Sequence, residues 1–148
     1  MKKVLISACI VGMNVRWNGA NKHNKDVQQW ALENGIELIP VCPENELFGT
    51  PRPPIKVLNV SGEVKFKMPS VYVCDLLEDK SKEIYGRYMD ASGFIGISGS
   101  PSCGKSVGVK GTGEMTRGFM HITTQLPTVE IGNLKSEACR AAFLRKLR

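Results

Sequence analysis

Three of the five cysteines have neighbours that would suit a bound inorganic group. Cys9 ends the string Ser-Ala-Cys, Cys42 is the centre of Val-Cys-Pro, and Cys103 lies in Pro-Ser-Cys-Gly. Small and rigid neighbours expose backbone amides and leave room for a bulky ligand on sulfur. Cys74, in an apolar stretch, and Cys139, in the last expected helix, are interpreted as thiols without a ligand. The first three are candidate ligands of a shared metal ion or cluster.

Two kinds of inorganic centre fit three thiolates. Zinc would keep an open fourth position, but catalytic zinc sites usually include histidine, and neither His23 nor His121 lies near a cysteine. An iron–sulfur cluster on three cysteines leaves one iron able to act as a Lewis acid. A sulfur-containing substrate would suit such an iron.

The elements that must position these cysteines form a βαβ pattern. Apolar runs bounded by small residues predict buried parallel strands, and apolar stripes at helical spacing predict helices between them. The expected strands are 4–6, 36–42, 93–98 and 128–131, and the expected helices follow Asn24 up to Gly35, span 71–91 and span 134–144. The segment 50–58, with three prolines, is expected to be an extended loop, 64–67 a small hairpin strand and 99–118 a glycine-rich loop. The predicted fold is a single α/β domain, residues 1–148, with a small parallel, Rossmann-like sheet and helices on both faces.

This topology brings the three cysteines together. Cys9 follows the first strand, Cys42 ends the second, and Cys103 lies in the loop after the third. The carboxyl ends of parallel strands meet at one edge of a sheet, where ligands bind in such folds. The three thiols are therefore expected at one site.

Composition limits the class of protein. The chain has 148 residues, of which 42% are hydrophobic and 23% charged, with a net charge of +6, which favours anionic or polar partners. The apolar start after two lysines is interpreted as a first strand, since no cleavage site follows, and no stretch is long enough to cross a membrane. We expect a cytoplasmic protein whose cysteines do not form disulfides.

Residues 99–106 offer a rival function. The string Gly-Ser-Pro-Ser-Cys-Gly-Lys-Ser matches the phosphate-loop pattern of nucleotide-binding kinases and hydrolases and follows a predicted strand. A phosphate loop needs a helix starting at its Lys-Ser, and three glycines between Val107 and Gly113 make a helix there improbable. This function is kept as an alternative.

An ordered set of short motifs resembles a known family. The motifs are Ser7-Ala8-Cys9, Gly12, Arg16-Trp17-Asn18-Gly19, Cys42-Pro43-Glu44, Thr50-Pro51-Arg52-Pro53-Pro54 and Ser100-Pro101-Ser102-Cys103-Gly104. In this order they resemble the thiouracil desulfidase (TudS-like) family, formerly a bacterial domain of unknown function. The chain departs from it at Val15, where many members have a second cysteine, and at Asn18, where they have aspartate.

The resemblance implies a cofactor and a reaction. It implies a [4Fe-4S] cluster on Cys9, Cys42 and Cys103, and non-redox conversion of 2- or 4-thiouracil to uracil with release of sulfide. The expected partner is a small thiolated nucleobase, with an RNA-derived substrate as an alternative, and the sequence carries no signal of oligomeric state. A non-catalytic cluster-binding sensor is the remaining alternative function.

Residues near the three cysteines supply the groups that hydrolysis needs. Glu44 is a candidate general base that activates water, and Ser102 is a candidate proton shuttle. Ser100, Lys105 and Arg52 are candidate substrate-binding residues, the last two because a cation stabilises developing negative charge.

Overall fold

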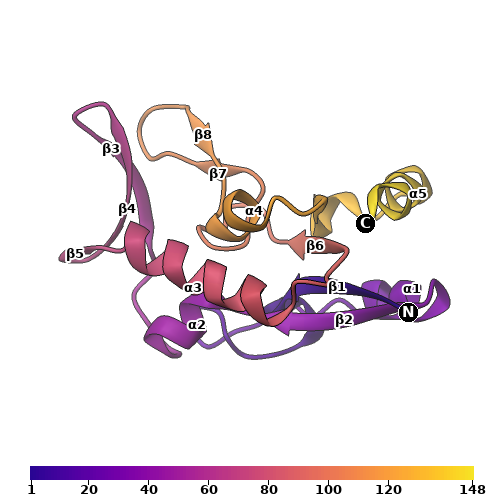
Figure 1. Cartoon of the computed structure of the whole chain (residues 1–148). Coiled ribbons are helices and arrows are strands. Elements are labelled where there is room, and N and C mark those ends of the chain that lie inside the picture. Colours follow the sequence, from indigo (N-terminus) through magenta and orange to yellow (C-terminus); the bar gives the residue numbers. More distant parts are fainter.

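A four-stranded parallel sheet forms the centre of the computed structural model, which describes residues 1–148 (Figure 1). Its strands lie in the order β2-β1-β6-β9, so the first strand is internal and the second is at an edge. Their bounds are β1 Lys2–Ser7, β2 Ile36–Val41, β6 Gly93–Gly96 and β9 Thr128–Glu130. All neighbouring pairs are parallel, as the sequence predicts.

Helix α1, Lys25–Glu33, connects the first two strands. The Asn24 side chain accepts a hydrogen bond from the amide of Val27 at 3.0 Å, which caps the helix as expected. Gly35 has a φ of 66°, a left-handed conformation that favours glycine where the chain turns into β2.

Helices cover both faces of the sheet. Val4 and Ile6 point to the face covered by α1 and by α5, Glu137–Lys146. Leu5 and Phe94 point to the other face, with Ile84 of α3, Cys74–Arg87, and Met120 of α4, Phe119–Thr124. Because side chains alternate along a strand, each buried strand packs against helices on both faces of the sheet. The predicted fold class is confirmed.

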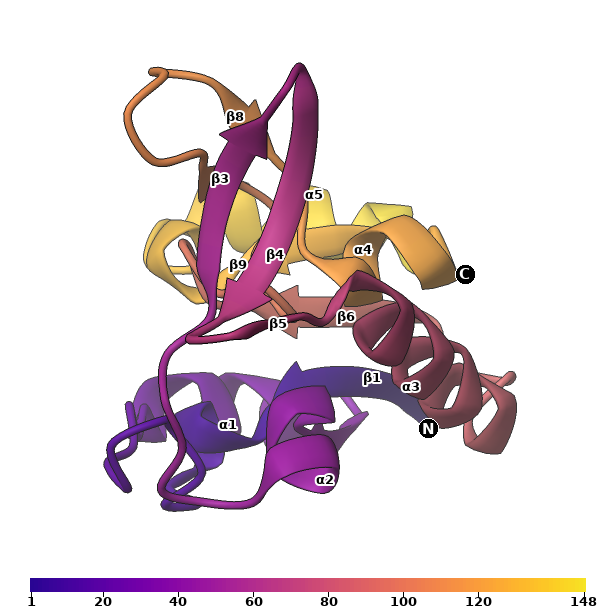
Figure 2. The same cartoon turned by 90° about the vertical axis from the view of Figure 1, so that its left-hand side faces the viewer.

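The segment 50–58 is partly a strand, which corrects the expected loop. β3, Lys56–Val60, pairs antiparallel with β4, Glu63–Met68, and the two form a hairpin that projects from the body of the molecule (Figure 2). The prolines end at Pro54, so the residues after it have the backbone N–H groups that pairing needs. Val71–Tyr72 adds a short strand, β5, and the helix expected from residue 71 therefore begins at Cys74.

The remaining elements are short. β7, Val107–Gly108, and β8, Met115–Thr116, form a small ribbon within the expected loop 99–118. The sequence did not predict α4, and it started the last helix too early, because a 3-10 turn at Ile131–Asn133 comes before α5. Two further short elements, a 3-10 turn at Ala8–Val11 and α2 at Pro43–Phe48, follow β1 and β2 directly. No helix is long and apolar enough to cross a membrane.

Candidate active site

A cavity of about 270 Å³ opens where β1, β2 and β6 end. The cysteines Cys9, Cys42 and Cys103 all line it, together with Glu44, Ser100, Ser102 and Arg52. Parallel strands bring residues that are distant in sequence to one edge of the sheet. The sequence-based expectation that the three thiols share a site agrees with this lining.

Cys9 and Cys42 are fixed by the turns that follow their strands. Cys9 lies in the 3-10 turn after β1, which ends at Gly12 with a φ of 95°. Cys42 precedes α2 and caps it, since its Sγ accepts a hydrogen bond from the amide of Asn45 at 3.4 Å. Pro43 occupies the first turn of that helix, where its missing N–H is not needed.

Cys103 is held by the loop after β6. Its amide donates a hydrogen bond to Ser100 Oγ at 3.1 Å, and the amide of Gly104 donates to the carbonyl of Ser100 at 2.8 Å. The loop folds back onto β6 so closely that a Cβ on Gly96 would overlap the carbonyl oxygen of Cys103. Glycine at position 96 is therefore a requirement of this loop.

The three thiols occupy an environment that disfavours their charged form in the absence of a cation. Burial raises the pKa of Cys9 and of Cys42, and it raises the pKa of Cys103 to about 12. A Cys42 thiolate would raise the pKa values of Cys9 and Cys103 further by repulsion. The positive charge of Arg16 partly lowers the pKa of Cys9, and that of Arg52 partly lowers the pKa of Cys42. Such thiols become thiolates most readily on a metal, which supplies positive charge.

The cavity fits a cluster better than a single ion. No three His, Cys, Asp or Glu side chains are gathered around a point where they could hold one metal ion. A cluster of several irons spans more space between its ligands. Two buried polar atoms of residues in the cavity wall, Ser7 Oγ and Arg52 Nε, lack a hydrogen-bond partner, and the Ser7 hydroxyl could donate to sulfide or to a bound substrate.

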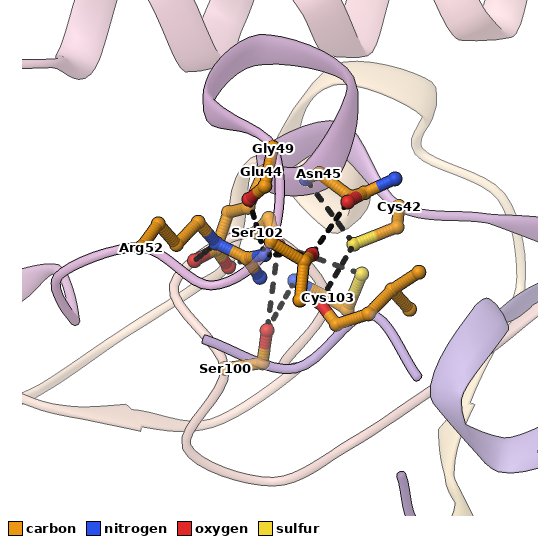
Figure 3. A network of polar contacts seen from close by, with 10 residues as sticks. Cys42, Glu44, Asn45, Gly49, Arg52, Ser100, Ser102 and Cys103 are labelled. Atoms are coloured by element: carbon orange, nitrogen blue, oxygen red, sulfur yellow. Dashed lines mark hydrogen bonds and ion pairs between the residues drawn. The ribbon is translucent and has the colours of Figure 1, made fainter. Parts of the chain in front are cut away.

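Glu44 is the centre of a buried polar network (Figure 3). Ser102 Oγ donates a hydrogen bond to Glu44 Oε2 at 2.7 Å, and Arg52 Nε lies 3.6 Å from Glu44 Oε1. Arg52 also donates to the carbonyl of Gly49 and to Thr50 Oγ1, both at 3.0 Å. A buried carboxylate oriented in this way beside three thiols is suited to accept a proton from water.

The structure separates Lys105 from the other predicted site residues. Its side chain lines a different hollow, and its Nζ lies 3.4 Å from the carbonyl of Thr128. The amides of Lys105 and Ser106 donate to Glu130 Oε2 at 3.2 and 3.3 Å, so a carboxylate occupies the donors that a phosphate loop would offer. Strand β7 follows them and no helix does, which argues against the phosphate-loop alternative.

Ser7, Arg16 and Trp17 are among the cavity residues for which the sequence predicted no role. Ser7 is the last residue of β1, while Arg16 and Trp17 belong to the segment between the turn at Ala8–Val11 and α1. Ser7 directly follows the expected strand 4–6 and lies two residues before Cys9, so its position was an available signal. The segment around Trp17 has no regular pattern, and only its place in the ordered motifs marked it.

Comparison with known proteins places the chain in a family. The family model described as 2-thiouracil desulfurase matches residues 4–130, which is most of the chain. The chain belongs to the 2-thiouracil desulfurase family. Membership confirms the resemblance expected from the motifs and the expected enzyme class.

Two further proteins are similar to this chain. A Bacillus subtilis (strain 168) protein called "Uncharacterized protein YbbK" is 27% identical over 119 residues, covering 74% of this chain and 78% of its own. The solved structure of a protein named [4Fe-4S]-dependent thiouracil desulfidase TudS is 21% identical, covers 96% of this chain and 99% of its own, and has a TM-score of 0.74. The second likeness shows that the same fold extends over nearly the whole chain.

Proposed function

We propose that this chain is a [4Fe-4S]-dependent desulfidase that converts a thiolated uracil to uracil and sulfide by hydrolysis of the C–S bond. The observation that carries the proposal is the shared cavity, which Cys9, Cys42 and Cys103 line together with the buried carboxylate of Glu44. The family model and the name of the similar solved structure support the same reaction and cofactor.

The three cysteines would hold the cluster through their thiolates. When bound in this way, the cluster supplies one iron without a protein ligand, which acts as a Lewis acid toward the sulfur of the substrate. The buried hydroxyl of Ser7, in the same cavity wall, would be available to donate a hydrogen bond to this group and to offset part of its negative charge.

Glu44 acts as the general base. Its carboxylate accepts a proton from a water molecule as the water oxygen attacks the carbon of the C=S bond. The C–O bond forms while the π pair of C=S moves to sulfur; the intermediate then loses its hydroxyl proton as the C=O bond forms, and the sulfur leaves with the electron pair of the broken C–S bond. One water and one thiouracil give one uracil and one hydrogen sulfide, so no oxidant or reductant is needed.

Ser102 and Arg52 keep Glu44 in position and assist the proton transfer. The Ser102 hydroxyl already donates to Glu44 Oε2 at 2.7 Å, and it can pass a proton from Glu44 to the leaving sulfur. Arg52 lies beside the other oxygen of Glu44 and stabilises its charge, while Ser100 supports the loop that carries Cys103. We therefore assign Arg52 to orienting the base rather than to direct contact with the substrate.

The substrate we propose is a free thiolated uracil, with the thiocarbonyl at position 2 or 4. The cavity of about 270 Å³ would hold the cluster as well as the substrate, which favours a small substrate such as a single-ring base. Either thiocarbonyl carbon lies next to a ring nitrogen and is open to the same attack by water.

Anaerobic purification followed by addition of thiouracil tests the proposal. We expect a brown protein with about four irons and four sulfides per chain, and release of one sulfide for each uracil formed. A brown protein that releases no sulfide from 2- or 4-thiouracil would be a cluster-binding sensor. A colourless protein that magnesium nucleotide stabilises against unfolding would instead support the phosphate-loop alternative.

A further inference from the structure

The wall of the cavity contains one large aromatic side chain, Trp17. Its side chain lines the same cavity as the three cysteines and Glu44, yet 44% of the residue's surface is exposed. The only other tryptophan, Trp30, is buried against the sheet and packs near Phe143. Trp17 is therefore the indole ring that a ligand in the cavity can reach.

The backbone that carries Trp17 is held on both sides. The amide of Gly19 donates to the carbonyl of Arg16 at 2.8 Å, and the amide of Arg16 donates to the carbonyl of Ala20 at 3.1 Å, which closes a tight turn. Gly19 has a φ of 82°, a conformation that glycine adopts without strain. The backbone that carries the indole is therefore fixed by a turn, and the rotation of the side chain is what the ligand would order.

A second contact ties this turn to the catalytic network. The amide of Arg52 donates a hydrogen bond to the carbonyl of Trp17 at 2.8 Å, and Arg52 is the residue that lies beside Glu44. The position of the indole is consequently set by the same segment that orients the proposed base.

From this geometry we infer that Trp17 is a stacking surface for the pyrimidine ring of the substrate. The inference rests on the proposed function and names the class of substrate that the site selects: planar, aromatic six-membered thiocarbonyl heterocycles. Indole stacks on any flat π-system, and one such contact with a base contributes about 1–3 kcal/mol, or roughly 5- to 150-fold in affinity.

The test compares two ligands and three variants of the cluster-loaded protein. Uracil and 5,6-dihydrouracil carry the same polar groups, but the second lacks the aromatic ring that stacking requires. Their binding is measured by calorimetry for the wild type, Trp17→Ala and Trp17→Phe, and KM for thiouracil is measured alongside. Met13→Ala is the matched control, because Met13 is an exposed apolar residue of the same segment that does not line the cavity.

We expect Trp17→Ala to weaken uracil binding and raise KM for thiouracil by about tenfold or more, with unchanged iron content and unchanged affinity for dihydrouracil. Trp17→Phe retains most of the affinity, and Met13→Ala behaves as the wild type. Equal losses for the two ligands, or a Trp17→Ala variant that binds uracil as the wild type does, would overturn the inference. If the wild type binds uracil but releases no sulfide from thiouracil, the proposed function fails, while the ratio of the two affinities still decides the role of Trp17.

Discussion

Glu44 is the residue whose surroundings give the most specific prediction. Its carboxylate is buried, accepts from Ser102 at 2.7 Å, and lies in the wall that the three cysteines share. Glu44→Gln keeps the size and a hydrogen-bonding oxygen but removes the ability to accept a proton from water. We expect kcat to fall by about 10²- to 10⁴-fold, with iron content unchanged, as measured by sulfide release and iron analysis.

Glu46→Gln is the matched control for this variant. Glu46 is on the same short helix, but its carboxylate forms a surface ion pair with Arg87. Surface pairs contribute little to stability, about 0–1 kcal/mol, so turnover should match the wild type. If the Glu44→Gln variant keeps its cluster and its full turnover, Glu44 is not the general base.

The five cysteines provide a second test at the level of residues. Alanine at Cys9, Cys42 or Cys103 removes one of three proposed ligands, and we expect each variant to lose its iron and brown colour. Alanine at Cys74 or Cys139 should leave both unchanged, because neither lines the cavity. Iron analysis of five anaerobically purified variants distinguishes the sets, and iron retained by Cys103→Ala would contradict the assignment.

The position of a residue in the cavity could be predicted from the sequence where the residue stands directly at a strand end. Cys9, Cys42 and Glu44 lie within three residues of β1 or β2, so their place in the cavity followed from topology alone. Lys105 shows the limit of the approach. Its loop folds back against β9, and a tight turn of that kind redirects the side chain away from the neighbouring Cys103 in a way that spacing does not reveal.

The loop that carries Cys103 packs closely against β6, and this packing can be tested by substitution at Gly96. Gly96 leaves no space for a Cβ, which would meet the Cys103 carbonyl, so Gly96→Ala must displace the loop. We expect a loss of about 1–3 kcal/mol in the free energy of unfolding and reduced iron content. Denaturant unfolding and iron analysis measure the two effects.

A second glycine offers the comparison for this variant. Gly108 in β7 has open space around its missing Cβ and does not have a positive φ. Gly108→Ala should therefore be tolerated with its cluster intact. If the two alanine variants were equally stable and equally loaded, close packing of the loop against β6 would not be what holds Cys103.

Helix α4 carries a histidine whose charge depends on folding. Burial lowers the pKa of His121, and nearby Arg117 and Lys105 lower it further. The unfolded chain, with a histidine pKa of about 6.5, then binds a proton more readily than the folded one. The contribution of His121 to the free energy of unfolding is therefore complete above about pH 6.5, and it is lost as the pH falls from there through the lower pKa of the folded state. In urea unfolding between about pH 5 and pH 8, the free energy of unfolding of His121→Gln should depend less on pH than that of the wild type. Equal slopes of this free energy against pH would contradict the assignment.

Elements with strong apolar patterns were predictable, and those built from pairing were not. The four parallel strands and α1 follow from apolar runs, the Asn24 cap and Gly35. β3 was missed because the prolines before it dominate a short window, and its pairing with β4 depends on residues beyond that window. α4 was missed because it is only six residues long and includes two threonines, which favour helix weakly.

For the whole molecule, the proposed cluster would tie together three segments that no disulfide connects. Binding energy that is available only to the folded chain adds to its stability. We expect anaerobic removal of the iron to lower Tm of the wild type. The Cys103→Ala protein should show no such change under the same treatment, and a Tm that does not respond to iron in the wild type would contradict this linkage.

The spread of the three thiols along the chain also sets the order in which synthesis, folding and assembly of the proposed cluster can occur. Cys103 lies beyond β6, so a nascent polypeptide lacks one of the three proposed ligands until Cys103 has been translated and the inner strands have paired. Assembly of the proposed cluster would then come late in folding, and it would have to precede the entry of the first substrate molecule into the cavity.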